Sequence, residues 1–307
     1  MLNRLIQILL ITSIALTQDV IGEGLYSSEL ISFLRTNYKT NSTLGYTACR
    51  DTLYLQVDRI EGEVKGVYTN YAVSLPDNGI DPSSHLYENG IDCEHVWPQS
   101  MYEGSDPMKS DMHHLRPCKS NVNSSRGNKP YGENLDSNTD TWFWLNQSQS
   151  SIPSSNIDEY SESETMYFEP REDRKGDIAR SMFYFYTMYS EVADDNFFDV
   201  QKDILKDWHL QDPSNIDEIN RTWAIASYQQ NKPNPFIIDE TLVYRAYFYE
   251  GSLVGDLNGD SNIDILDVVF LVNVILNGGQ NTPNSDLNND GDCNILDVVI
   301  LASIILS

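Results

Sequence analysis

A segment of fourteen residues occurs twice near the end of this 307-residue chain, and this repeat constrains its folding more than any other feature. The first copy begins at Asp256 and the second at Asp286, and each runs directly into an apolar stretch. Such a duplication predicts two copies of one loop-and-helix unit. From Gly251 onward there are eight Asp and no Glu, Lys or Arg, so this part supplies -8 of a formal net charge of -26. We therefore expect residues 251–307 to form a small all-α domain of two loop-helix repeats.

Oxygen-bearing side chains recur in each copy at loop positions 1, 3, 5, 9 and 12, and position 7 can add its carbonyl, the arrangement that wraps six or seven oxygens around Ca²⁺. The predicted ligands of two Ca²⁺ ions are Asp256, Asn258, Asp260, Asn262 (carbonyl), Asp264 and Asp267 in the first loop, and Asp286, Asn288, Asp290, Asp292 (carbonyl), Asn294 and Asp297 in the second. The pair resembles a dockerin, which implies a cohesin-type protein as partner. It departs from the pattern at Ser261, where Gly is expected, and by having Asp in place of Glu at position 12. A tail that only stabilises the protein or aids its secretion remains an alternative.

The first residues have the pattern of an export signal. Arg4 precedes an apolar run from Leu5 to Leu16, which predicts a signal peptide over residues 1–22 and a secreted, extracellular protein, with a periplasmic or cell-surface location also open. An N-terminal core helix is the alternative. No later stretch reaches the roughly 18 apolar residues of a membrane span, so we expect no membrane partner. Export permits disulfides, and Cys49 with Cys93 is the pairing that we favour.

The remaining chain, residues 23–250, has a helical pattern with short extended segments. Apolar spacing predicts helices over 25–38, 176–189, 198–210 and 216–229, alternation predicts a strand over 63–69, and residues 146–165 have the composition of a solvated loop. We expect an α+β, mostly helical domain.

A positive segment lies within this acidic chain. Between Lys109 and Gly132 there are five Lys or Arg residues and one acid, although the net charge of -26 argues against a protein that coats nucleic acid through a diffuse basic surface. Contact with a polyanion would have to be local and metal-assisted.

Three residues near this segment have the chemistry of phosphodiester hydrolysis, which needs a base to activate water and a cation to neutralise developing charge. His95 is a natural base because its unperturbed pKa lies near neutrality. Glu94 and Asn123 offer oxygens to a hard cation. On a strand, Glu94 and His95 would point to opposite sides, so the site requires a kink or a ligand from a loop.

The chain resembles the endonuclease I family, secreted or periplasmic nucleases with a ββα-metal (His-Me finger) site. The resemblance is carried in order by segments 45–50, 66–69, 93–100 (CEHVWPQS), 110–115, 121–128, 176–180 (GDIAR) and 234–237. It implies a metal-dependent endonuclease that cleaves DNA, and RNA as well, without sequence specificity. His95 would be the general base, Glu94 and Asn123 would bind one Mg²⁺ or Ca²⁺, and a helix starting near Ser120 would present Asn123.

The same resemblance suggests further residues. Arg126 and Arg180 would support the phosphate, and His113 and His114 would lie on the second strand of the finger. Three alternatives remain. The histidines with Glu94 could bind zinc, Cys93 could be a nucleophile, or the body could be an inactive nucleic-acid-binding or scaffold module tethered through the tail.

Overall fold

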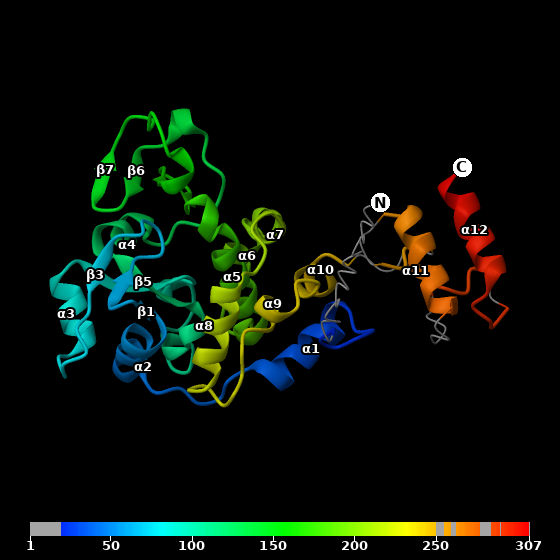
Figure 1. Cartoon of the computed structure of the whole chain (residues 1–307), viewed down its shortest axis with the longest axis horizontal. Helices are drawn as coiled ribbons and strands as arrows, with labels where there is room; N and C mark the ends of the chain where they lie inside the picture. The colour runs from blue at the N-terminus through cyan, green and yellow to red at the C-terminus, as the bar shows by residue number, and fades with distance from the viewer. Residues whose placement is uncertain (1–19, 250–254, 259–261, 277–283, 289, 307) are drawn as a thin grey trace, which may run out of the picture.

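The structure is a computed structural model that describes residues 20–249, 255–258, 262–276, 284–288 and 290–306 (Figure 1). Most of the expected signal peptide, the junction between residues 250 and 251, and the loop residues Asp260 and Ser261 lie outside the described residues. No helix within the described ranges has the length and apolarity needed to cross a bilayer.

Helices and short strands alternate along the body. The helices are α1 (Ser27–Tyr38), α2 (Tyr46–Thr52), α3 (Pro82–Glu88), α4 (Ser120–Arg126), α5 (Lys175–Tyr189), α6 (Asp195–Asp199), α7 (Lys202–Gln211), α8 (Ile216–Ala226), α9 (Pro235–Ile238) and α10 (Leu242–Tyr247). The strands are β1 (Arg59–Ile60), β2 (Glu63–Lys65), β3 (Ala72–Ser74), β4 (Ile91–His95), β5 (Leu115–Lys119), β6 (Thr141–Trp144), β7 (Gln147–Gln149), β8 (Ser161–Ser163) and β9 (Phe168–Glu169). The expectation of a mixed α+β body is confirmed.

Helix α5 lies at the centre of the main hydrophobic core. Nearly every one of its side chains is buried, as the many apolar residues of this segment predict. Trp97, which follows β4, stacks on Phe185 of α5 with ring centroids 4.9 Å apart. This contact fixes the end of β4 against the core. A second, smaller core lies between α2 and the opposite face of β4 and contains Leu53, Cys93 and Leu115.

The strands form three antiparallel sheets among the described residues: β1-β2-β3, β4-β5, and β7-β6-β8-β9. In the two-stranded sheet, Glu94 lies opposite Arg116 and His95 opposite Leu115, and α4 begins directly after β5. The backbone N–H of Ser120 donates to the carbonyl of Gly90 at 2.9 Å, which fixes the start of α4 against the beginning of β4.

Two expectations about local structure were wrong. The segment 146–165 was expected to be a solvated loop, yet it contributes β7 and β8, and the polar side chains of β8 are buried because they have partners: Ser161 donates to the carbonyl of Tyr68 at 2.7 Å. The helix expected over 198–210 is divided into α6 and α7. Its break coincides with Gln201, whose buried side chain accepts a hydrogen bond from the backbone of Tyr131 at 2.9 Å.

The cysteines and the paired histidines also differ from expectation. No disulfide joins Cys49 to Cys93, since both are free thiols, and Cys49 donates to the carbonyl of Tyr46 at 3.1 Å. His113 and His114 do not lie on β5 but in the 3₁₀ turn η4 (Met112–His114) that precedes it. Asp111 caps this turn by accepting from the backbone of His113 at 3.1 Å.

In the tail, α11 (Ile265–Leu276) and α12 (Ile295–Ile305) pack against each other (Figure 1). Each begins within one copy of the repeat, as a duplicated loop-and-helix unit predicts. Leu271 and Leu301, at equivalent positions of the two helices, are fully buried.

Candidate active site

The candidate site is built on the β4-β5 hairpin and the helix that follows it. Successive side chains of a strand point to opposite faces, so Asp92 and Glu94 lie on one face of β4 while Cys93 and His95 lie on the other. The sequence predicted this opposition, and the structure does not remove it with a kink, because β4 and β5 pair in register through His95.

Glu94 is only 2% exposed, and one of its two carboxyl oxygens contacts two polar side chains. Oε1 accepts a hydrogen bond from the Tyr68 hydroxyl at 2.7 Å and lies 3.5 Å from Nη1 of Arg126. Burial raises the pKa of the Glu94 carboxyl to about 7, although Arg126 and Tyr68 act in the opposite direction. A bound cation would favour the charged form of this carboxyl.

Asn123 is presented by α4 on the Glu94 face of the hairpin. Its amide nitrogen donates to Oδ1 of Asp92 at 2.6 Å and to the carbonyl of Cys93 at 3.4 Å. These bonds use the donors of the amide and leave its oxygen as the group that can bind a ligand. Asp92 is a residue that sequence reasoning missed, and the available signal was its spacing of two from Glu94, which places both carboxylates on one face of the strand.

His95 lies on the opposite face and is 6% exposed. Its Nε2 lies 3.1 Å from the carbonyl of Lys109, and its Nδ1 lies 3.3 Å from the amide nitrogen of Gln99. Since a carbonyl can only accept, these contacts assign the proton to Nε2 and the lone pair to Nδ1, toward which the Gln99 amide donates. Burial, with the nearby ring of His114, lowers the pKa of His95 to about 3, so the imidazole is neutral at physiological pH.

Arg126 links the two faces through the backbone. It is 1% exposed, donates to the carbonyls of Val96 at 2.7 Å and His95 at 3.4 Å, and lies 4.7 Å from the centroid of the Tyr131 ring. Together with its contact to Glu94, these bonds bring Arg126 into the same cluster as two of the predicted site residues. Backbone carbonyls, Glu94 and the Tyr131 ring therefore surround the Arg126 guanidinium.

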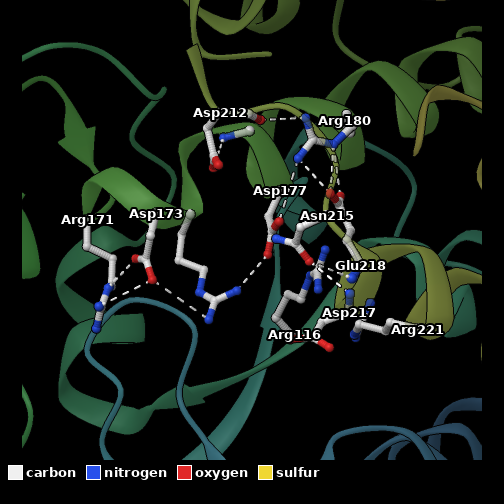
Figure 2. Close-up of polar contacts among 12 residues, drawn as sticks. Arg116, Arg171, Asp173, Asp177, Arg180, Asp212, Asn215, Asp217, Glu218 and Arg221 are labelled. Carbon is white, nitrogen blue, oxygen red and sulfur yellow. Dashed lines mark hydrogen bonds and ion pairs between the residues drawn. The ribbon is translucent and has the colours of Figure 1, made fainter. Parts of the chain in front are cut away.

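Arg180 lies in a different cluster (Figure 2). It is fully buried in α5, with Nη2 2.6 Å from Oε2 of Glu218 on α8 and Nη1 donating to the carbonyl of Asp212 at 2.8 Å. The structure gives it no contact with Glu94, His95 or Asn123. A cavity of about 680 Å³, lined by Arg116 and Arg221 among others, lies beside this cluster.

The other histidines near the site are held by carbonyl groups. His113 Nε2 lies 2.8 Å from the carbonyl of Lys232, and His114 Nε2 lies 2.7 Å from that of Met108. Among the residues that the structure describes, no three or more His, Cys, Asp or Glu side chains are grouped so as to hold a metal ion. This finding gives no support to zinc ligation by the histidines. The pair of Glu94 and Asn123 contains a single carboxylate and is not a group of that kind.

The described tail residues close their loops through the carboxylate at position 12. Asp267 accepts from the backbone of Leu257 at 2.8 Å and of Asp264 at 2.8 Å, and Asp297 makes equivalent bonds to Leu287 and Asn294, each at 2.8 Å. The two copies therefore share one local geometry. The atoms of these loops that could bind a metal ion are all oxygens, the ligand type that suits a hard cation such as Ca²⁺.

The chain is similar to known proteins over both its body and its tail. Residues 27–241 match the endonuclease I family, so the chain belongs to that family. Residues 254–306 match the dockerin type I domain.

Two curated relatives bear on the body of the chain. An extracellular ribonuclease of Bacillus subtilis (strain 168) is 32% identical over 161 residues, which cover 47% of this chain and 49% of the relative. An extracellular ribonuclease of Bacillus amyloliquefaciens is 29% identical over 237 residues, which cover 66% of this chain and 74% of the relative. The chain thus spans about half the length of the first of these relatives and about three quarters of the second.

Proposed function

We propose that this protein is a secreted, metal-dependent endonuclease that hydrolyses phosphodiester bonds of RNA and DNA without sequence specificity. The observation that carries the proposal is the placement of Glu94 and His95 on one strand of a hairpin whose following helix presents Asn123, in a chain of the endonuclease I family. We interpret this unit as a ββα-metal finger. The names of the two relatives favour RNA as one substrate and export as the destination.

His95 would act as the general base through Nδ1. The carbonyl of Lys109 holds the Nε2 proton, so the lone pair on Nδ1 is free to take a proton from water, and the buried imidazole begins the reaction neutral. The amide of Gln99 now donates toward this lone pair and would have to give way to that water.

Glu94 and Asn123 would hold one Mg²⁺ or Ca²⁺. Both offer oxygens on the same face of the hairpin, and the second carboxyl oxygen of Glu94 and the amide oxygen of Asn123 accept no hydrogen bond from the described residues. The ion, when bound, would neutralise charge that develops on the phosphate. Asp92 would orient the Asn123 amide.

Arg126 would act as a positioning residue rather than by touching the phosphate, because its donors hold the carbonyls of His95 and Val96. The burial of Arg180 in an ion pair with Glu218 favours the same indirect kind of role.

The tail would bind two Ca²⁺ ions and attach the enzyme to a cohesin-type protein. Its match to the dockerin type I domain and the exposed apolar residues at equivalent positions of α11 and α12, Ile265 with Ile295 and Leu266 with Leu296, support this proposal.

The test is digestion of supercoiled plasmid and of single-stranded RNA by the purified full chain with Mg²⁺, with Ca²⁺ and with neither. We expect cleavage of both substrates only with a divalent ion, and a loss of at least about a hundredfold in His95→Ala, since a positioned base contributes on that order. His85→Ala is the matched control, because His85 lies on α3 and, among the described residues, its ring hydrogen-bonds only to the carbonyl of Ser74, to which Nε2 donates at 2.9 Å. Undiminished cleavage by His95→Ala would refute the assignment, and binding without cleavage by the parent protein would indicate an inactive module.

A further inference from the structure

Two cations lie beside His95 without any acidic partner. Tyr46 and Arg50 are four residues apart on α2 and so share one face of that helix. The Arg50 guanidinium lies 4.6 Å from the centroid of the Tyr46 ring, and the Lys109 ammonium lies 4.9 Å from it. The Tyr46 ring is in turn 5.4 Å from the ring of His95. Both cations therefore lie over one ring that is itself close to the candidate base.

Within the described part of the chain, no carboxylate lies within 4.0 Å of Arg50 or Lys109. Nε of Arg50 is buried and donates to no acceptor. Arg221 and Arg180, by contrast, are matched by acids: Arg221 by Asp58 at 2.7 Å and Arg180 by Glu218.

The lack of an acidic partner among the described residues is unexpected from composition, because the chain has 46 acidic residues and 20 Lys or Arg. Asp92 and Asp106, the latter three residues before Lys109, are engaged elsewhere: Asp92 accepts from Asn123, and Asp106 accepts from the hydroxyl of Ser110. A buried donor without an acceptor costs free energy unless a ligand satisfies it. We therefore expect the partner of Arg50 and Lys109 to be a bound ligand.

We propose that Arg50 and Lys109 form a phosphate-binding site at the edge of His95, which takes a backbone phosphate of the nucleic-acid strand. Arg50 offers a planar fork that can bind two phosphate oxygens, and Lys109 adds a point charge. Tyr46 holds both cations over its ring and toward the base. The inference rests on the proposed nuclease function and names the groups that recognise its substrate.

The first test is binding without turnover. In the His95→Ala background, the affinity for a fluorescent single-stranded oligonucleotide is measured by anisotropy over a series of salt concentrations. Each phosphate contact contributes about 0.7 to the slope of log K against log salt, so Arg50→Gln and Lys109→Gln should each flatten the slope by about this amount. Arg50→Lys should restore part of the affinity.

The matched control is Lys202→Gln on α7, which removes one positive charge from a surface ion pair with Asp199. We expect it to leave the slope unchanged. Slopes for Arg50→Gln and Lys109→Gln equal to that of the control would overturn the inference.

The second test uses the active protein. Arg50→Gln should raise KM about tenfold at low salt and leave the melting temperature near that of the parent, because a lost charged hydrogen bond acts on the bound strand. A fall in melting temperature with unchanged KM would instead mean that the cations only support Tyr46. Cleavage that survives His95→Ala would sink the proposed function, whereas an unchanged slope in Arg50→Gln would sink only this site.

Discussion

Glu162 shows how strongly burial acts on one carboxyl group in this protein. It is 7% exposed, accepts a hydrogen bond from the Thr139 hydroxyl, and shares a cavity of about 260 Å³ with Glu133, Glu169 and other acids. Burial raises its pKa to about 7, with Thr139 acting against the shift. An ordinary glutamate in the unfolded chain titrates near 4.5.

Between pH 4.5 and about 7, Glu162 is therefore protonated in the folded protein and deprotonated in the unfolded chain. The stability that Glu162 contributes is present below this window and is lost as the pH rises through it. Glu162→Gln removes the titration and should raise the melting temperature by a few degrees at pH 8.5, with a smaller gain at pH 5. Thermal unfolding at both pH values measures this, and the exposed Glu103→Gln should show no such pH dependence. An equal effect of Glu162→Gln at the two pH values would contradict the account.

At the residue scale, the candidate site was predictable where a motif fixes residue type and spacing. The order of Glu94, His95 and Asn123 indicated one acid, one base and one amide before any coordinates, and α4 begins at Ser120 as expected. The partners that set their chemistry were not predictable. The carbonyl of Lys109, which fixes the tautomer of His95, lies fourteen residues away, and a backbone carbonyl leaves no mark on the sequence.

At the scale of elements, the ion pair between Arg180 and Glu218 connects α5 to α8. Periodicity located α5 to within a residue, but it could not supply the partner of Arg180. Side-chain partners also explain the missed strand β8 and the break at Gln201, since polar residues look solvated until a cross-chain bond is known.

Removal of Arg180 should show how much this ion pair affects the free energy of unfolding. Arg180→Ala leaves Glu218 buried without its partner, and we expect a loss of about 3–5 kcal/mol in the free energy of unfolding. Lys202→Ala, which breaks a surface pair, should cost less than about 1 kcal/mol. Urea unfolding measures both. If Arg180→Ala instead kept its stability and raised KM, Arg180 would act on the substrate and not between the helices.

At the scale of the whole molecule, charge and repetition alone indicated two parts of different composition, the body and the tail. The tail carries -8 without a single cation, and its two copies fold into α11 and α12 as the duplication indicated. Whether each loop binds an ion depends on how its oxygens are used. In the second loop Asp297 accepts from backbone amides at both ends of the loop, while Asp286 accepts from Asp290 at 3.1 Å.

This geometry makes position 12 the point where the second loop and its helix are joined, so Asp297→Ala should weaken Ca²⁺ binding at that loop at least about tenfold. Calorimetric titration of the full chain should then detect one strong site in place of two, while plasmid cleavage with Mg²⁺ stays unchanged because the proposed catalytic ion would be held by Glu94 and Asn123. Asp292→Asn removes the same charge as Asp297→Ala but should retain both calcium sites, since position 7 contributes only its carbonyl. Two strong sites in Asp297→Ala, or equal loss in Asp292→Asn, would show that net charge rather than this loop geometry governs calcium binding.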